Sequence, residues 1–255
     1  MDQRILDLII LLAVAFVPSL IYLVWIRSAE RYGQEPYGRL LRIFVFGAVI
    51  SVAIAVLIEL LLMVLVDQNI NRVYEVFGQD PNLSNLILAC IVAPVVEEMA
   101  KGLGVFKARR FMSEVEDGII FGAAAGLGFA ATENLLYESN TYFTDGAGAF
   151  ITIAVIRSLS SALLHASASS VFGLGIARSA LQGRSWFLYY LGAVTMHGIF
   201  NLAASFGSIY EEDIGPAAYL IGLAAAFAIA IVGISMVRSK IRSLDSQWRG
   251  PARSR

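Results

Sequence analysis

The sequence predicts an all-α membrane protein, a single bundle of about seven transmembrane helices. Of the 255 residues, 58% are hydrophobic and 15% are charged, whereas a soluble domain carries about 25% charged residues. The mean hydropathy is +0.71. The apolar stretches are long and continuous, which favours spanning helices over the short, alternating strands of a membrane barrel. These observations together predict a polytopic protein embedded in a lipid bilayer.

Seven stretches reach the length of about 20 apolar residues that is needed to cross roughly 30 Å of hydrocarbon. The first stretch is longer than the core of a signal peptide and lacks a clear small-residue cleavage site, so we count it as a spanning helix. Short connections predict one transmembrane domain at residues 1–237 and a basic tail at residues 238–255. The predicted helices, in chain order, cover residues 5–26, 43–66, 84–106, 118–137, 149–177, 186–209 and 217–237.

The basic residues predict how the helices are oriented. The loops that follow the odd-numbered helices, together with the tail, carry 15 of the 19 lysines and arginines, and the opposite loops are mainly acidic. Lysine and arginine are enriched on the cytoplasmic side of membrane proteins. We therefore expect a multi-pass protein of the cell membrane with its amino terminus outside and its tail in the cytoplasm.

Charge and cysteine content exclude two classes of function. The formal net charge is -1 and no basic patch with interleaved aromatic residues is visible, so we expect no nucleic-acid partner. Cys90 is the only cysteine, which excludes a disulfide framework or a thiolate metal cage within one chain.

A small set of ionisable groups lies inside the apolar stretches, where each costs about 2.5 to 3.5 kcal/mol by insertion scales. Groups that expensive point to a functional site, and asparagines at positions 134 and 201 accompany them. The set comprises Glu59, Glu97, Glu98, Lys101, Glu133, Arg157, His165 and His197.

The third predicted helix carries two adjacent acids. Glu97 and Glu98 stand four and three residues before Lys101, so the ammonium can pair with one of them on a shared helix face. Adjacent residues point about 100° apart on a helix. One carboxylate is therefore left for proton transfer or for binding a ligand. Pro94 loosens the backbone just before this pair.

The fourth predicted helix combines a small-residue stripe with an acid. Gly118, Gly122 and Gly126 recur every fourth residue and let another helix approach closely. Glu133 follows on the same helix, about 9 Å to the outer side of mid-span at 1.5 Å per residue. This offset separates Glu133 from the other polar groups unless the helix is tilted or a water-filled cavity reaches inward.

The fifth and sixth predicted helices each place a histidine near mid-depth. His165 lies in a polar stripe of serines, and His197 and Asn201 share one face because they are four residues apart. Neutral imidazole and carboxylate are ligand types that zinc accepts, with three ligands and an open position in catalytic sites. The H-E-x-x-H zinc motif is absent.

Four segments together resemble the motifs of the PrsW family of intramembrane proteases. They are E-E-M-A-K at 97–101, F-G-A-A-A-G-L-G-F-A-A-T-E-N-L-L-Y at 121–137, H-A-S-A-S from His165, and H-G-I-F-N at 197–201. That family is similar to the CAAX prenyl endopeptidases and bacteriocin-processing proteins. Where the prenyl endopeptidases have F-x-x-x-H, this chain has Phe129-x-x-x-Glu133, which is the PrsW pattern and argues against a prenylated substrate.

The resemblance implies a protease that cuts a single-pass membrane protein, such as an anti-sigma factor, with its core motifs at residues 84–209. In the expected chemistry one of Glu97 and Glu98 takes a proton from water, and the resemblance favours Glu97. Lys101 orients Glu98 and offsets its charge. Asn201 donates to the developing oxyanion, where one such donor is worth about 2.7 to 4 kcal/mol.

The expected metal ligands are His165, His197 and Glu133, around a zinc ion that acidifies the attacking water and polarises the scissile carbonyl. The alternative is that the same three residues act by hydrogen bonding without a metal. We expect Glu59 and Arg157 to form an accessory ion pair or to be solvated separately, outside the site.

Two other classes of function fit part of the sequence. A proton- or ion-coupled transporter also keeps acids and histidines at mid-membrane, although no inverted repeat is visible. A non-catalytic scaffold would bind a partner's helix through the glycine stripe. Substitution of Glu97 by Gln separates the three functions, because only a protease would lose cleavage while retaining substrate binding.

Overall fold

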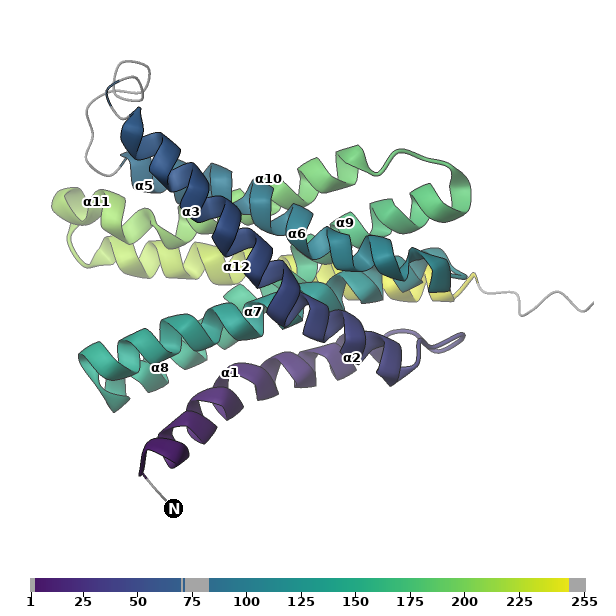
Figure 1. Cartoon of the computed structure of the whole chain (residues 1–255), viewed down its shortest axis with the longest axis horizontal. Helices are drawn as coiled ribbons and strands as arrows, with labels where there is room; N and C mark the ends of the chain where they lie inside the picture. The colour runs from purple at the N-terminus through teal and green to yellow at the C-terminus, as the bar shows by residue number, and fades with distance from the viewer. Residues whose placement is uncertain (1–2, 70, 72–82, 248–255) are drawn as a thin grey trace, which may run out of the picture.

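The computed structural model describes residues 3–69, 71 and 83–247 of the chain. The described residues are almost entirely helical and contain no strand, and seven helical stretches are long and apolar enough to cross a membrane (Figure 1). The predicted fold class is confirmed. These stretches cover Arg4–Arg27, Tyr37–Val66, Leu83–Phe111, Val115–Asp145, Ala147–Gln182, Phe187–Ile214 and Ala217–Asp245.

Two of the seven stretches are interrupted by a π-helix, which hydropathy did not predict. A π-turn widens the helix by one residue and occurs frequently at functional sites. Both interruptions border the site described below. The first three stretches consist of α1 (Gln3–Arg27); α2 (Tyr37–Val45), η1 (Phe46–Ser51) and α3 (Val52–Gln68); and α5 (Leu83–Ile87), η2 (Leu88–Val92), α6 (Ala93–Ala108) and the short η3 (Arg109–Phe111).

Helix α7 (Val115–Asp145) is the centre of the bundle and packs against α1, α2, η1, α6, α8 and α9. It begins at a capping box, in which the Asp117 carboxylate accepts a hydrogen bond from the backbone of Glu114 at 2.9 Å. It ends at Gly146, whose φ of +84° turns the chain into α8 (Ala147–Leu159). This central position explains why α7 is the most buried of the spans.

The glycine stripe of α7 packs against α9 (Ser161–Gln182). A Cβ added at Gly126 would overlap the carbonyl oxygen of His165 and lie 2.7 Å from its carbonyl carbon. Gly118 and Gly122 make equally close approaches to the α9 backbone at Gly173 and Ser169. The stripe therefore sets the distance between the helix that carries Glu133 and the helix that carries His165.

The last helices are α10 (Phe187–Ala204), α11 (Phe206–Ile214) and α12 (Ala217–Asp245). Helix α12 continues past residue 237, where the sequence predicted that the tail begins. Ile241 is fully buried in these added turns, and the Asp245 carboxylate accepts hydrogen bonds from the backbone amides of Arg31 and Tyr32 at 3.0 and 2.8 Å. Packing and these contacts extend the helix into polar sequence, and residues 248–255 of the predicted tail lie outside the described residues.

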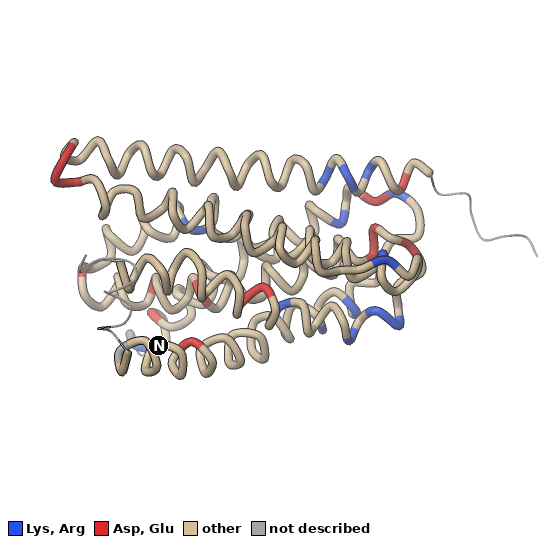
Figure 2. Tube along the Cα trace, turned by 90° about the horizontal axis from the view of Figure 1, so that it is seen from above, with Lys and Arg blue, Asp and Glu red and all other residues tan. Residues whose placement is uncertain are grey.

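Most lysines and arginines gather at one end of the bundle (Figure 2). This separation is the one that the positive-inside rule requires, and the orientation itself stays a prediction. The same end buries Glu30 in the loop between α1 and α2, where its carboxylate accepts a hydrogen bond from the Glu35 amide at 3.3 Å. Burial and the nearby Asp117 carboxylate raise the pKa of Glu30 to about 8.

Candidate active site

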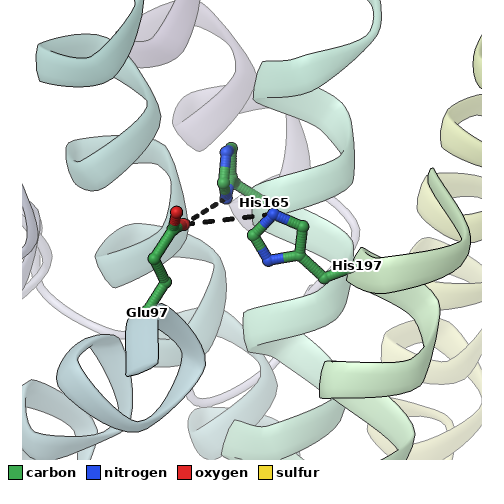
Figure 3. A group of neighbouring side chains, drawn as sticks. All are labelled: Glu97, His165 and His197. Atoms are coloured by element: carbon green, nitrogen blue, oxygen red, sulfur yellow. Dashed lines mark ion pairs between the residues drawn. The ribbon is translucent and has the colours of Figure 1, made fainter. Parts of the chain in front are cut away.

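Four helices bring the predicted polar residues together. Helix α6 supplies Glu97, Glu98 and Lys101, α7 supplies Glu133, α9 supplies His165, and α10 supplies His197 and Asn201. Glu97, His165 and His197 converge on one point inside the bundle (Figure 3). One ligand atom from each of these three residues lies within 4.8 Å of the other two. The structure thus unites residues that are separated by up to 100 positions in the chain.

Glu97 has a free oxygen at the centre of this group. Its Oε2 atom lies 4.0 Å from His165 Nδ1 and 4.0 Å from His197 Nε2. The same atom is buried and has no hydrogen-bond partner among the described residues, although Lys101 Nζ is 3.1 Å away. The contact between Lys101 Nζ and Glu97 Oε2 is short enough for an ion pair, but its angles are not those of a hydrogen bond. A buried acceptor without a hydrogen bond is costly in a stable protein.

A carboxylate from another helix orients each imidazole. His165 Nε2 is 2.9 Å from Glu133 Oε2, and His197 Nδ1 is 3.0 Å from Glu98 Oε1. Since an ionised carboxylate only accepts hydrogen bonds, the ring nitrogens that face Glu133 and Glu98 carry the protons. The other nitrogen of each neutral ring then carries a lone pair and lies 4.0 Å from Glu97 Oε2. The lone pair of His165 accepts a hydrogen bond from Lys101. This arrangement matches the carboxylate–histidine pairs that support metal-binding histidines.

Lys101 is the cation at the base of the site. Its side chain is fully buried, and Nζ donates to Glu98 Oε1 at 2.7 Å and to His165 Nδ1 at 2.8 Å. Ser169 donates to the second oxygen of Glu98 at 2.9 Å. Glu98 is therefore held by Lys101, His197 and Ser169, whereas Glu97 has only the ion pair with Lys101 and lines the cavity described below.

Arg157 belongs to the site, which the sequence analysis missed. Its Nη2 donates to Glu133 Oε2 at 2.8 Å and its Nε donates to Asn134 Oδ1 at 2.8 Å. The pairing of Arg157 with Glu59 that the sequence suggested is replaced by this pairing with α7. The sequence showed that Arg157 and Glu133 are both charged residues within apolar stretches, which suggests that they could pair. Hydropathy does not tell which helices are neighbours, so the pairing could not be predicted.

A cavity of about 390 Å³ opens beside these groups. Glu97, Glu133 and His165 line it together with Glu59 and Arg157. The sequence placed Glu133 about 9 Å to the outer side of mid-span. In the structure its side chain reaches His165 and borders the same cavity. A cavity of this volume has room for several water molecules beside the Glu97 oxygen that has no hydrogen bond, and a hydrolytic site needs such a water.

Comparison with known proteins identifies the family. The sequence profile of the PrsW family intramembrane metalloproteases matches residues 35–233. The chain belongs to the PrsW family. It is 30% identical over 205 residues to the protein named Protease PrsW of Clostridioides difficile (strain 630), covering 77% of this chain and 78% of that protein. It is 25% identical over 195 residues to Protease PrsW of Geobacillus kaustophilus (strain HTA426), covering 75% and 78%.

No solved structure matches this chain at a significant level. PrsW membership confirms the predicted peptidase activity, and with the seven apolar helices it confirms a multi-pass membrane protein that acts on a membrane-embedded substrate. A peptidase activity replaces the transporter and scaffold alternatives that the sequence left open. The family is described as a metalloprotease family, and the Glu97, His165 and His197 cluster of this PrsW protease is a possible metal site.

Asn201 lies at the cavity wall of this PrsW protease, on the turn after His197. Its Nδ2 donates to the carbonyl oxygen of Ala89 in η2 at 2.7 Å. An amide nitrogen carries two N–H groups, so one donor is used to join α10 to η2 and a second is left for the cavity. The assignment of Asn201 to an oxyanion stays a prediction.

Proposed function

We propose that this intramembrane protease cleaves a single-pass membrane protein by glutamate-assisted attack of water, at a centre formed by Glu97, His165 and His197. The observation that carries the proposal is the buried Glu97 Oε2, which has no hydrogen bond and faces two imidazole lone pairs on the wall of a cavity. Such an oxygen is placed to take a proton from a water molecule in that cavity.

The donor atoms fit a zinc ion. Ligand atoms around tetrahedral zinc lie about 3.4 Å apart when each bond is 2.0 to 2.2 Å, and the separations here run from 4.0 Å to at most 4.8 Å. Small side-chain rotations close that difference. We therefore propose His165, His197 and Glu97 as ligands, with Glu97 in the place that the sequence analysis gave to Glu133. With zinc bound, Glu97 Oε2 would be the ligand atom, and the second oxygen, Oε1, would take the proton of the attacking water. Glu133 instead accepts a hydrogen bond from Nε2 of His165, the ring nitrogen that is farther from Glu97.

A bound zinc would supply acidification of water and polarisation of the scissile carbonyl. The protein's own groups prepare the rest. Glu133 and Glu98 fix the protonation of the two imidazoles, so that the nitrogen of each ring that lies nearer Glu97 is the unprotonated one. Lys101 would give up its bond to His165 Nδ1 if that nitrogen held a metal, and it would keep its ion pairs with Glu97 and Glu98.

Asn201 and Lys101 complete the proposed machinery. The second N–H of Asn201 donates to the oxygen of the tetrahedral intermediate, while its first N–H holds η2 in place. Lys101 neutralises the buried Glu98, and Glu97 is the carboxylate of this pair that lines the cavity. The resemblance to PrsW supports an anti-sigma-factor-like substrate. The gathering of basic residues at one end of the bundle supports an outward amino terminus and a cytoplasmic tail as parts of this proposal.

The test combines cleavage and metal analysis in purified full-length protein. We expect Glu97→Gln to lower the rate of cleavage of a single-pass membrane substrate by at least 100-fold, while the substrate still copurifies. Glu212→Gln, an exposed acid on α11, is the matched control and keeps the wild-type rate. Full cleavage by Glu97→Gln would overturn the glutamate mechanism.

Zinc is tested separately from the glutamate. We expect about one zinc per chain in the wild type and its loss in His197→Ala, because a three-ligand site tolerates no missing ligand. Metal-free protein that cleaves at the wild-type rate would refute the zinc assignment and leave the role of Glu97 standing.

A further inference from the structure

A second cavity adjoins the catalytic cavity on the lipid side. It is a groove of about 330 Å³ between α3 on one side and α5, η2 and the start of α6 on the other. Val56, Glu59, Ala89 and Ala93 line both the groove and the catalytic cavity. The two spaces therefore adjoin, and the wall that they share has alanines on the η2 side.

The groove lies on the surface that faces lipid. The span that contains α3 is the least buried of the seven, and Leu57, Leu60 and Leu61 of α3 have exposed fractions of 72%, 54% and 61%. Figure 1 shows α3 crossing the front of the bundle rather than lying within it. A polypeptide that is itself within the membrane can reach the groove without crossing water.

The opposite wall is fixed to the catalytic helix α10. Asn201 donates to the Ala89 carbonyl of η2, and Gly198 approaches the Cys90 carbonyl so closely that a Cβ there would overlap it. Helix α10 also carries His197. A chain lying against η2 is thereby held at a set distance from the histidine centre.

Glu59 stands where groove and cavity meet and lacks a partner. Its Oε1 atom is buried and accepts no hydrogen bond from the described residues. The catalytic cavity is lined by three carboxylates, those of Glu59, Glu97 and Glu133, and by one guanidinium, that of Arg157, which is bonded to Glu133. A carboxylate left without a donor inside a membrane protein is expensive, so a hydrogen-bond donor from outside the chain would relieve that cost.

We propose that the substrate polypeptide enters from the lipid between α3 and η2, and that Glu59 binds a hydrogen-bond donor of the entering chain. This inference rests on the proposed function of the centre. A substrate helix must unwind before its peptide bond can be attacked, and each amide N–H freed within the membrane costs several kcal/mol if it finds no acceptor. Glu59 supplies that acceptor, either to backbone amides or to a lysine or arginine side chain of the substrate, and it is a positioning residue.

The first experiment measures KM and kcat for a single-pass substrate in vesicles. We expect Glu59→Gln to raise KM about 10-fold or more, as for the loss of a charged hydrogen bond, with kcat changed less than threefold. Single lysine-to-glutamate changes along the substrate separate the two sources of the donor. If a substrate side chain is bound, Glu59→Lys reverses the preference at one substrate position; if backbone amides are bound, it raises KM equally for every substrate variant.

The second experiment tests the route itself. Val56→Trp fills the junction and is expected to raise KM at least 10-fold, whereas Leu57→Trp, the next residue on the lipid-facing side of α3, keeps the wild-type value. A photoreactive side chain at position 60, which lines the groove, is expected to capture substrate in the Glu97→Gln background, and one at position 57 is not. This capture does not depend on how well the tryptophan variant folds.

The outcomes distinguish the route from the chemistry. Suppose that wild type cleaves the substrate and Glu97→Gln does not. If the changes at positions 56 and 59 then leave KM unaltered and position 60 captures no substrate, the proposed entry route is wrong and the proposed catalytic centre is retained. If wild type and Glu97→Gln cleave equally, the proposed function fails first.

Discussion

Gly126→Ala tests whether the approach of α7 to α9 sets the geometry of the centre. The added methyl group would lie 2.7 Å from the carbonyl carbon of His165 and 3.0 Å from Ser169 Oγ. Carbon atoms in ordinary contact are about 3.5 to 4.0 Å apart, so the two backbones must separate by roughly 1 Å. Overpacking of this kind costs about 1 to 3 kcal/mol of stability.

The catalytic effect of that separation should exceed the stability effect. His165 lies on α9 and its carboxylate partner Glu133 lies on α7, joined at 2.9 Å, so the shift lengthens the bond that orients the ring. A displacement of about 1 Å in a catalytic group can cost about 100-fold in rate. We expect Gly126→Ala to lower kcat/KM by that factor in protein that is still folded.

The assay is cleavage of a reconstituted single-pass substrate, with thermal unfolding of the same preparation measured in parallel. Gly148→Ala is the matched control, since a Cβ at Gly148 on α8 meets no atom within 4 Å. Both variants should unfold cooperatively. A Gly126→Ala protein that cleaves within twofold of wild type would show that the spacing of α7 and α9 does not govern the centre.

Three further predictions concern the charged groups. Lys101→Met should destabilise the protein by about 3 to 5 kcal/mol, because it leaves Glu98 buried without its cation. In thermal unfolding, the double variant with Glu98→Gln should recover most of that stability. If the two substitutions instead destabilise additively, the pairing is contradicted. Arg157→Gln should lower kcat/KM about 10- to 100-fold, because Glu133, which orients His165, loses its 2.8 Å bond to Arg157. Groups that orient a metal-binding histidine have effects of this size. An unchanged rate would show that Arg157 does not belong to the site. The pKa of Glu30 is raised from 4.5 to about 8, so between about pH 5 and pH 8 the folded state holds a proton that the unfolded chain releases, and stability should fall as pH rises through this range. In Glu30→Gln, the melting temperature should depend less on pH between about 5 and 8. An unaltered dependence would refute the assignment.

The fold was predictable because lipid imposes a length and a composition on every span. The seven helices follow from hydropathy, whereas their ends do not: Ile241 and Asp245 continue α12 through polar sequence by packing and by contacts to the α1–α2 loop. The π-turns at η1 and η2 also escaped prediction, since one extra residue in a helical turn leaves the hydropathy unchanged.

The residues of the candidate site were predictable by the cost of placing charge in hydrocarbon, but their pairing was not. The spacing on one helix predicted an ion pair between Lys101 and one of Glu97 and Glu98, and the structure contains both pairs, at 3.1 and 2.7 Å. The contacts of Glu133 with His165 and Arg157 join three helices. Such contacts depend on which helices are neighbours and how they are rotated, which a single sequence does not contain.

The histidine–carboxylate pairs have a consequence for how this protease is made. His165 is oriented by a residue of α7 and His197 by a residue of α6, so each imidazole is held only when two helices have already docked. During synthesis, α6, α7 and α9 enter the membrane before α10. The unfinished chain therefore has no complete centre until α10, the last of these four helices, has docked.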